Sequence, residues 1–195
     1  IAVLEQRRAT SEALIARLVA EQTFKEEVSF PEELLASDNP DVKSAVQAQR
    51  NIFNDRRSIF LSQTEILEYR AEQLSGQAEG YEVQLEALEK RVELRRELFE
   101  RMRSGEERGV IESNRLSDME DEVIQIEASI GTAMSDIAQV KAAAGEARLN
   151  ILKLKQEYSE RANSELKTAR SELAEINDAT LTDEYIRYLA ANIMQ

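Results

Sequence analysis

Acidic side chains are the main candidates for chemistry in this sequence, and many of them gather between residues 106 and 122. Glu106 and Glu107 are adjacent, and Asp118, Asp121 and Glu122 lie within about one turn of a helix. Carboxylates at this spacing can bind a cation or act as general acids. Acidic residues this dense are far more often the solvated face of a helix, so the sequence predicts no metal site and no catalytic site here.

The residue types that would complete a catalytic or metal-binding group are absent. The chain has no His and no Cys, which removes the usual nucleophile–base pairs, thiolate zinc sites and helical di-iron sites. Four of its six glycines form two isolated pairs four residues apart, at 76 and 80 and at 105 and 109, and not a phosphate-binding loop. The sequence therefore predicts a protein that is not an enzyme and binds no cofactor.

The composition is typical of long helices. The 195 residues include only six Gly and two Pro, and aromatic residues make up 5%, so narrow helix seams are expected in place of a large core. The formal net charge of −13 disfavours binding to nucleic acid and to anionic lipid. The sequence contains no apolar run near the roughly 20 residues that span a membrane.

Three helices are expected, at about residues 1–22, 40–103 and 113–177. The first ends before a segment in which Pro31 disfavours helix at the preceding residue. The second begins where Asn39 can cap the helix and Pro40 takes the first helical position.

The second and third helices carry the apolar pattern of a coiled coil. In the second helix, one series recurs every seven residues: Phe53, Phe60, Leu67, Leu74, Tyr81 and Leu88. A companion series lies four positions later: Thr64, Ala71, Ala78, Leu85, Val92 and Phe99. In the third helix, spacings of three and four alternate from Leu116 to Tyr158. Tyr158, Ala162 and Leu166 are then spaced four and four, a stutter that locally unwinds a supercoil.

Two arms of equal length joined by a short loop predict an antiparallel hairpin. Residues 40–103 and 113–176 each make an arm of 64 residues, roughly 95 Å long if fully helical. Residues 104–112 would form the tip, where Gly105 or Gly109 can adopt positive φ and Ser113 or Asn114 can cap the returning helix. The fold class is therefore all-α: a long antiparallel coiled-coil hairpin with a short third helix packed at its base.

The first helix is too short to reach the tip, so it should pack near the other end of the hairpin. Its Leu14 and Leu18 are expected against four apolar residues of the arms: Phe53, Phe60, Leu166 and Leu173. Residues 1–178 would then form one hairpin domain. The tail at 179–195 leaves the heptad pattern and is open between a short separate helix and sequence foreign to the domain.

Several short motifs, in order, resemble the membrane fusion proteins of bacterial type I secretion systems. An F-P-x-x-L segment is matched by Phe30, Pro31 and Leu34. A helix start with Pro-x-Val is matched by Pro40 and Val42, and a Q-x-x-[LI]-F-x-x-R stretch by Gln49, Ile52, Phe53 and Arg56. After the tip, the family has Arg-Leu, here Arg115 and Leu116. The chain is similar to the HlyD-like periplasmic adaptors, and most of all to the protease and lipase secretion adaptors.

This resemblance implies a function in protein export. Such adaptors bridge an inner-membrane ABC transporter to a TolC-like outer-membrane channel, and assemble as a ring that is expected to be a hexamer. The chain would be the periplasmic domain of a single-pass inner-membrane protein. Two other interpretations remain open from the residues alone: a coiled-coil scaffold or spacer unrelated to secretion and, less favoured by the net charge, a curved membrane-binding helical dimer.

The resemblance also implies that the tip meets the channel. The candidate contacts at the tip are three arginines that can donate hydrogen bonds and three apolar residues among them: Arg101, Arg103, Arg108, Val110, Ile111 and Leu116. Many such adaptors have an Arg-x3-Leu-x6-Ser pattern at the tip, which this chain does not match. Counting from Arg101, Gly105 stands where the pattern has Leu and Glu112 where it has Ser.

The predicted seam makes the shape of the molecule testable. An antiparallel hairpin with arms of this length should scatter X-rays in solution as a rod roughly 100 Å long. A radius of gyration near the approximately 16 Å of a compact 195-residue domain would contradict the hairpin.

Overall fold

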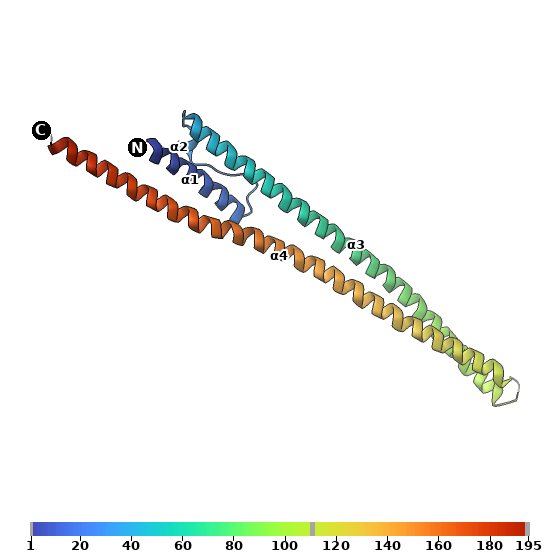
Figure 1. Cartoon of the computed structure of the whole chain (residues 1–195). Coiled ribbons are helices and arrows are strands. Elements are labelled where there is room, and N and C mark those ends of the chain that lie inside the picture. Colours follow the sequence, from blue (N-terminus) through green and yellow to red (C-terminus); the bar gives the residue numbers. More distant parts are fainter. Residues whose placement is uncertain (1, 110–111, 194–195) are drawn as a thin grey trace. The chain divides into compact units, whose positions relative to one another are not determined.

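All regular secondary structure in the computed structural model, which describes residues 2–109 and 112–193, is α-helical. The helices are α1 (Ala2–Gln22), α2 (Glu32–Leu35), α3 (Pro40–Glu106) and α4 (Ser113–Ile193) (Figure 1). Helices α3 and α4 form an antiparallel hairpin, and α1 packs against it, which confirms the predicted fold class.

Local signals place the start of α3 where the sequence predicts it. The Oδ1 atom of Asn39 accepts a hydrogen bond from the backbone N–H of Asp41 at 2.9 Å, and the carbonyl of Asn39 accepts one from Lys43 at 3.1 Å. Asn39 thus caps the helix, and Pro40 takes the first position, where a missing N–H has no cost. At its other end α3 runs to Glu106, three residues past the expected end at Arg103.

The expected end of α4 at residue 177 is wrong, because the helix continues to Ile193. Residues 179–193 contain neither Gly nor Pro, so no stop signal follows the last heptad. Asp183 and Arg187 add an ion pair at 3.3 Å, one turn apart. Losing the heptad pattern ends the seam but not the helix. The division into a domain at 1–178 and a tail stays a prediction.

The chain divides into two compact units. The three-helix unit comprises residues 1–65 and 152–195, and the two-helix unit comprises residues 66–151. Both long helices run through both units, so each unit holds one segment of α3 and one segment of α4.

In the three-helix unit, α1 lies between α3 and α4 and is apolar on two sides (Figure 1). Toward α3, Ala9 and Ala13 join an apolar cluster with Phe30 and Leu34 of the connecting segment and Val42 and Val46 of α3. Toward α4, Leu18 packs on Ala162, Leu166 and Ala169. The contact predicted between Leu18 and Leu166 is thus present. A helix that is buried on two sides shows little amphipathicity, which explains why the stripe of α1 is poorly defined in the sequence.

In the two-helix unit, α3 and α4 meet along a seam of small side chains. The buried apolar residues of this seam are Ala71, Ala78, Val92, Ile126, Ala133, Ala144 and Ala147. Alanine lets the helices approach closely but buries little area, so packing alone specifies the register of the pair only weakly.

Polar pairs beside this seam form a ladder with a heptad period. Its rungs join α3 to α4: Arg96 to Glu127, Glu82 to Lys141, and Ser75 to Arg148. Their shortest donor–acceptor separations are 2.5 Å, 2.6 Å and 2.8 Å in that order. Between the first two rungs α3 steps back 14 residues while α4 advances 14, and the third rung lies seven further in each. Whole-heptad steps in opposite directions fix an antiparallel register.

One rung of this ladder is incomplete and makes the register testable. Halfway between the first two rungs, the same register sets Glu89 of α3 opposite Met134 of α4, which is 57% exposed. The substitution Met134→Lys should raise the free energy of unfolding by about 0.2–1 kcal/mol at low salt, because it adds the missing cation. The gain should fade in concentrated salt.

The matched control for this rung is Met134→Glu, which sets a second anion opposite Glu89. Denaturant unfolding of both variants checks the register, since only the lysine should stabilise. Equal stability of the lysine and glutamate variants would contradict it.

Candidate functional site

The turn between α3 and α4 is built around one glycine with positive φ. Gly109 has φ +73° and donates its N–H to the carbonyl of Glu106 at 2.7 Å. Of the two glycines predicted for this role, Gly109 therefore takes it, and Gly105 is buried within α3. Because α4 begins at Ser113, Glu112 and not Ser113 or Asn114 stands directly before the first helical residue.

The three arginines predicted for the tip expose their side chains. The Nε atom of Arg101 donates to the carbonyl of Glu97 at 3.4 Å, and Arg103 lies 3.9 Å from Glu100. Arg108 is exposed in the turn after α3. Contacts this long hold the guanidinium groups loosely, so they remain accessible to a partner.

The three apolar tip residues are only partly described. Leu116 is half-buried in the first turns of α4, and Val110 and Ile111 lie outside the described residues. The role of all six tip residues in binding a partner stays a prediction.

One acidic residue near the tip, Glu122, joins the two arms of the hairpin. Glu122 lies 3.1 Å from Arg95 and 3.5 Å from Arg91, so its charge pairs α4 with α3. Within residues 2–109 and 112–193, no three acidic side chains are grouped so as to hold a metal ion.

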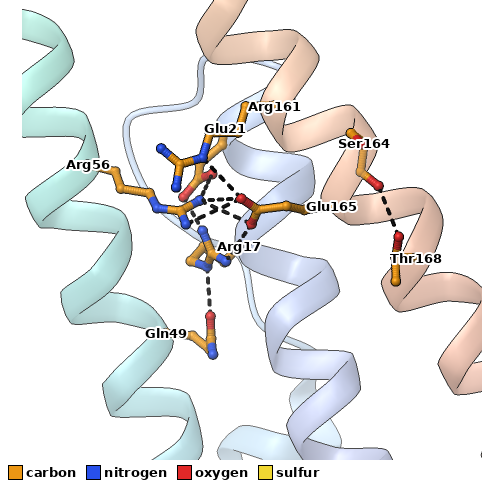
Figure 2. Close-up of polar contacts among 8 residues, drawn as sticks. All are labelled: Arg17, Glu21, Gln49, Arg56, Arg161, Ser164, Glu165 and Thr168. Atoms are coloured by element: carbon orange, nitrogen blue, oxygen red, sulfur yellow. Dashed lines mark hydrogen bonds and ion pairs between the residues drawn. The ribbon is translucent and has the colours of Figure 1, made fainter.

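A second candidate site, in the three-helix unit, is a cluster of charges that the sequence analysis missed. Its centre is the ion pair between Arg17 and Glu21 of α1, whose closest atoms are 2.5 Å apart (Figure 2). The two residues are only 3% and 2% exposed. Arg17 also donates from Nε to the side-chain oxygen of Gln49 on α3, at 2.7 Å.

Both long helices add a charge to this pair. Arg56 of α3 lies 3.2 Å from Glu21 and 3.2 Å from Glu165 of α4. Glu165 in turn lies 3.4 Å from Arg17 and 3.1 Å from Arg161. Three arginines and two glutamates from three helices therefore meet in one network, with each glutamate shared between two or more arginines (Figure 2).

The network shifts the pKa of two of its members. Burial alone would lower the pKa of Arg56, but the hydrogen bonds and charges of Glu165 and Glu21 outweigh burial and raise it. Burial would raise the pKa of Glu165, but hydrogen bonds from Arg56 and Arg161 and the charges of Arg56 and Arg17 outweigh it and lower the pKa. Both shifts favour the charged forms.

A buried ion pair of this kind specifies an arrangement more than it stabilises one. The desolvation of Arg17 and Glu21 offsets most of their attraction, whereas removing one partner strands the other and typically costs about 3–5 kcal/mol. The network therefore penalises any packing of α1 that does not bring Arg17 and Glu21 to Arg56 and Glu165.

Three aromatic rings lie beside the charges, one in the turn after α1 and one each in α3 and α4. The ring centroids of Phe60 and Tyr158 are 4.5 Å apart, and Phe24 lies 5.8 Å from each. Burial, followed by the charge of Glu21, raises the pKa of the Tyr158 hydroxyl. These rings close the end of α1 against both long helices.

Phe24 also ends α1 in a strained conformation. Its φ is +52°. The backbone N–H of Phe24 donates to the backbone carbonyl of Glu21, and that of Lys25 donates to the backbone carbonyl of Ala20, which is the Schellman pattern. The left-handed conformation costs a residue with a Cβ roughly 1–2 kcal/mol. Aromatic contacts worth about 0.5–1.5 kcal/mol each offset this cost and explain why phenylalanine stands where glycine is usual.

A cavity of about 520 Å³ lies against the charged network and the rings. It is lined by Arg56, Phe60 and Gln63 of α3, by Tyr158 and Arg161 of α4, and by Glu21 of α1. The charged residues that line it are already paired, since Glu21 contacts Arg56 and Arg161 contacts Glu165. Glu157, which also lines it, lies 3.7 Å from Lys153. The arrangement holds helices together and offers no nucleophile–base pair for catalysis.

Some residues of this network belong to patterns that can be recognised in the sequence. Gln49 and Arg56 are two residues of the motif that resembles secretion adaptors, and both contact α1. Arg17 and Glu21 lie one turn apart next to Leu14 and Leu18, so two opposite charges border an apolar face. That pattern is common on exposed helices as well, and only a third helix packed over it reveals that the charges are buried.

Comparison with known proteins identifies both a family and a fold. A family model described as "AprE, long alpha-helical hairpin" matches residues 1–184. Among solved structures, the soluble domain of LipC, a membrane fusion protein of a type I secretion system, aligns with a TM-score of 0.88. The alignment covers 94% of this chain and 87% of that chain at 19% sequence identity, so it shows a shared fold. No curated protein sequence matches the chain.

The lowered pKa of Glu165 predicts a loss of stability in acid. Its contribution is fully present above the ordinary carboxyl value of 4.5 and is lost as the pH falls through the lower pKa of the folded state. The variant Glu165→Gln should be less stable than the parent near pH 7, and the difference should shrink below about pH 4.5. Thermal unfolding between pH 7 and pH 3 checks this.

Glu172→Gln is the matched control, because Glu172 is exposed on the same helix seven residues later. Its stability should follow that of the parent at every pH. If the stability of the Glu165→Gln variant changed with pH in the same way as that of the parent, the ionisation of Glu165 would not contribute to the stability of the fold.

Proposed function

Because the chain belongs to the AprE family of long α-helical hairpins, we propose that it is the hairpin domain of a membrane fusion protein of a type I secretion system. It is an interaction element of an export machine and not an enzyme. The observation that carries this proposal is the family match over residues 1–184, supported by the likeness to the LipC soluble domain over almost all of both chains.

The motifs of the family have structural roles that fit this proposal. Phe30, Leu34 and Val42 are buried together where the connecting segment crosses from α1 to α3. Phe53 is almost wholly buried, and Arg56 joins α1 to α4. Several residues of these motifs therefore hold α1 and the connecting segment against the hairpin.

The proposed partners are those expected of an adaptor in a type I secretion system. The domain bridges an inner-membrane ABC transporter to a TolC-like outer-membrane channel, as part of a homo-oligomeric ring that is a hexamer. It is the periplasmic part of a single-pass inner-membrane protein. In the described part of the chain, no helix is both long enough and apolar enough to cross a bilayer. The net charge of −13 argues against nucleic acid as a partner.

The hairpin tip is the surface that meets the channel. Arg101, Arg103 and Arg108 present exposed guanidinium groups that suit carboxylates and backbone carbonyls. Leu116, together with Val110 and Ile111, supplies the apolar part of the contact. The exposed arginines around a single turn support this role, because a turn that only reverses the chain needs no such donors.

Removing the apolar part of the tip should stop secretion. The triple variant Val110→Ser, Ile111→Ser and Leu116→Ser, made in the full-length protein, is expected to abolish export of the cognate substrate. Helicity measured by circular dichroism should be nearly unchanged, because Leu116 is only half-buried. Secreted substrate is measured in the culture medium of cells that express the matching transporter and channel.

The matched control replaces two exposed apolar residues along α3, by Val83→Ser and Leu94→Ser, which are 68% and 66% exposed. This variant should secrete normally. Normal secretion by the stably expressed tip variant would show that the channel contact lies elsewhere. A loss of secretion in both variants would mean that the effect is not specific to the tip.

A further inference from the structure

In the three-helix unit, the faces of α3 and α4 that point toward α1 carry their inward residues at similar intervals, although α1 lies between the two helices. Counting away from the turn, the inward residues of α3 are Phe60, Arg56, Phe53, Gln49, Val46 and Val42. The inward residues of α4 are Tyr158, Ala162, Leu166, Ala169, Leu173 and Ile176. The six residues of α3 alternate spacings of four and three, as in a coiled-coil seam, and those of α4 do so after the four-and-four step at Tyr158, Ala162 and Leu166.

Two direct contacts set the pairing of these layers. The rings of Phe60 and Tyr158 stack at 4.5 Å, and Arg56 binds Glu165 directly at 3.2 Å. Extending the antiparallel pairing from these contacts sets Phe53 opposite Leu166, Val46 opposite Leu173, and Val42 opposite Ile176. The four large apolar residues of α3 would then each meet a large apolar residue of α4, and the polar Arg56 and Gln49 would lie opposite Ala162 and Ala169.

In the structure these layers are covered by α1. Val42 and Val46 pack on Ala9 and Ala13, and Leu166 packs on Leu18. Ala13 and Leu18 are wholly buried, with no exposed surface, so α1 fills the space between the two faces. The connection after α1 is attached at Phe24 and at the apolar cluster of Phe30 and Leu34.

The charges of the network divide cleanly between α1 and the hairpin. Arg17 and Glu21 both belong to α1 and neutralise each other one turn apart. Arg56 and Glu165 belong to α3 and α4 and bind each other without any residue of α1. Withdrawing α1 therefore leaves no buried charge without a partner, which would otherwise cost about 3–5 kcal/mol.

We propose that α1 is a displaceable wedge, and that its release lets α3 and α4 pair directly along the layers from Phe53–Leu166 to Val42–Ile176. The three-helix unit then has two packings: one with α1 inserted, and one in which the hairpin seam continues toward the start of α3. Bistable elements of this kind arise where two packings bury similar surfaces. The switch depends on packing alone and not on the proposed function.

Spin labels on the outer surfaces of the two helices test the switch in the full chain. The chain has no Cys, so Gln47→Cys and Ala174→Cys, both at exposed positions near the Val46–Leu173 layer, give one unique label pair. The double variant Ala13→Glu and Leu18→Glu sets carboxylates at two fully buried positions of α1 and expels it. Val3→Glu, at a position that is 69% exposed, is the matched control.

Pulsed electron-electron double resonance measures the distance between the labels. In the double variant this distance should shorten by about 5 Å as the helices reach the 8–10 Å separation of direct packing, and the control should keep the parent distance. Circular dichroism should show that α3 and α4 remain helical. An unchanged distance, or a broad and longer distribution with loss of helicity, would overturn the proposal.

Discussion

The arrangement of the three-helix unit depends on where the buried charges of α1 find their partners. Arg17 and Glu21 are almost fully removed from water, and their partners from the long helices are Gln49, Arg56 and Glu165. The apolar contacts of α1 are mostly alanine on one side and aliphatic on the other, and such surfaces tolerate sliding. A slide by one turn would separate the charges, so electrostatics selects one register among several that packing alone would allow.

The same constraint explains the stutter in α4. Tyr158, Ala162 and Leu166 leave the alternation of three and four at the point where α4 changes partner from α3 to α1. Tyr158 still stacks on Phe60 of α3, whereas Ala162 and Leu166 pack on Leu18 of α1. A spacing of four and four turns the inward face slightly and aims it at the inserted helix. The heptad pattern of α4 is thus interrupted where a third helix packs against it.

The sequence predicts the fold well because its strongest signals are local and repeated. Asn39 and Pro40 fix the start of α3, Gly109 marks the turn, and the heptads give the antiparallel pair. The end of α4 was missed, because a lost heptad pattern is not a helix stop. Arg17, Glu21 and Glu165 were missed for a different reason. Their burial depends on residues up to 148 positions apart, and no local pattern distinguishes a buried ion pair from an exposed one.

The two units fix the register of their helices by different interactions. In the two-helix unit, small seam residues bring α3 and α4 close together, and exposed pairs such as Glu82–Lys141 repeat at heptad intervals to fix their register. Each exposed pair contributes little, so several are needed. In the three-helix unit, one buried network fixes the register. A misplaced charge that is shielded from water costs far more free energy than a misplaced charge at the surface. A long hairpin needs both devices. The repeated weak pairs set the register along the arms, and the single buried network sets the register of α1 while it is inserted between them.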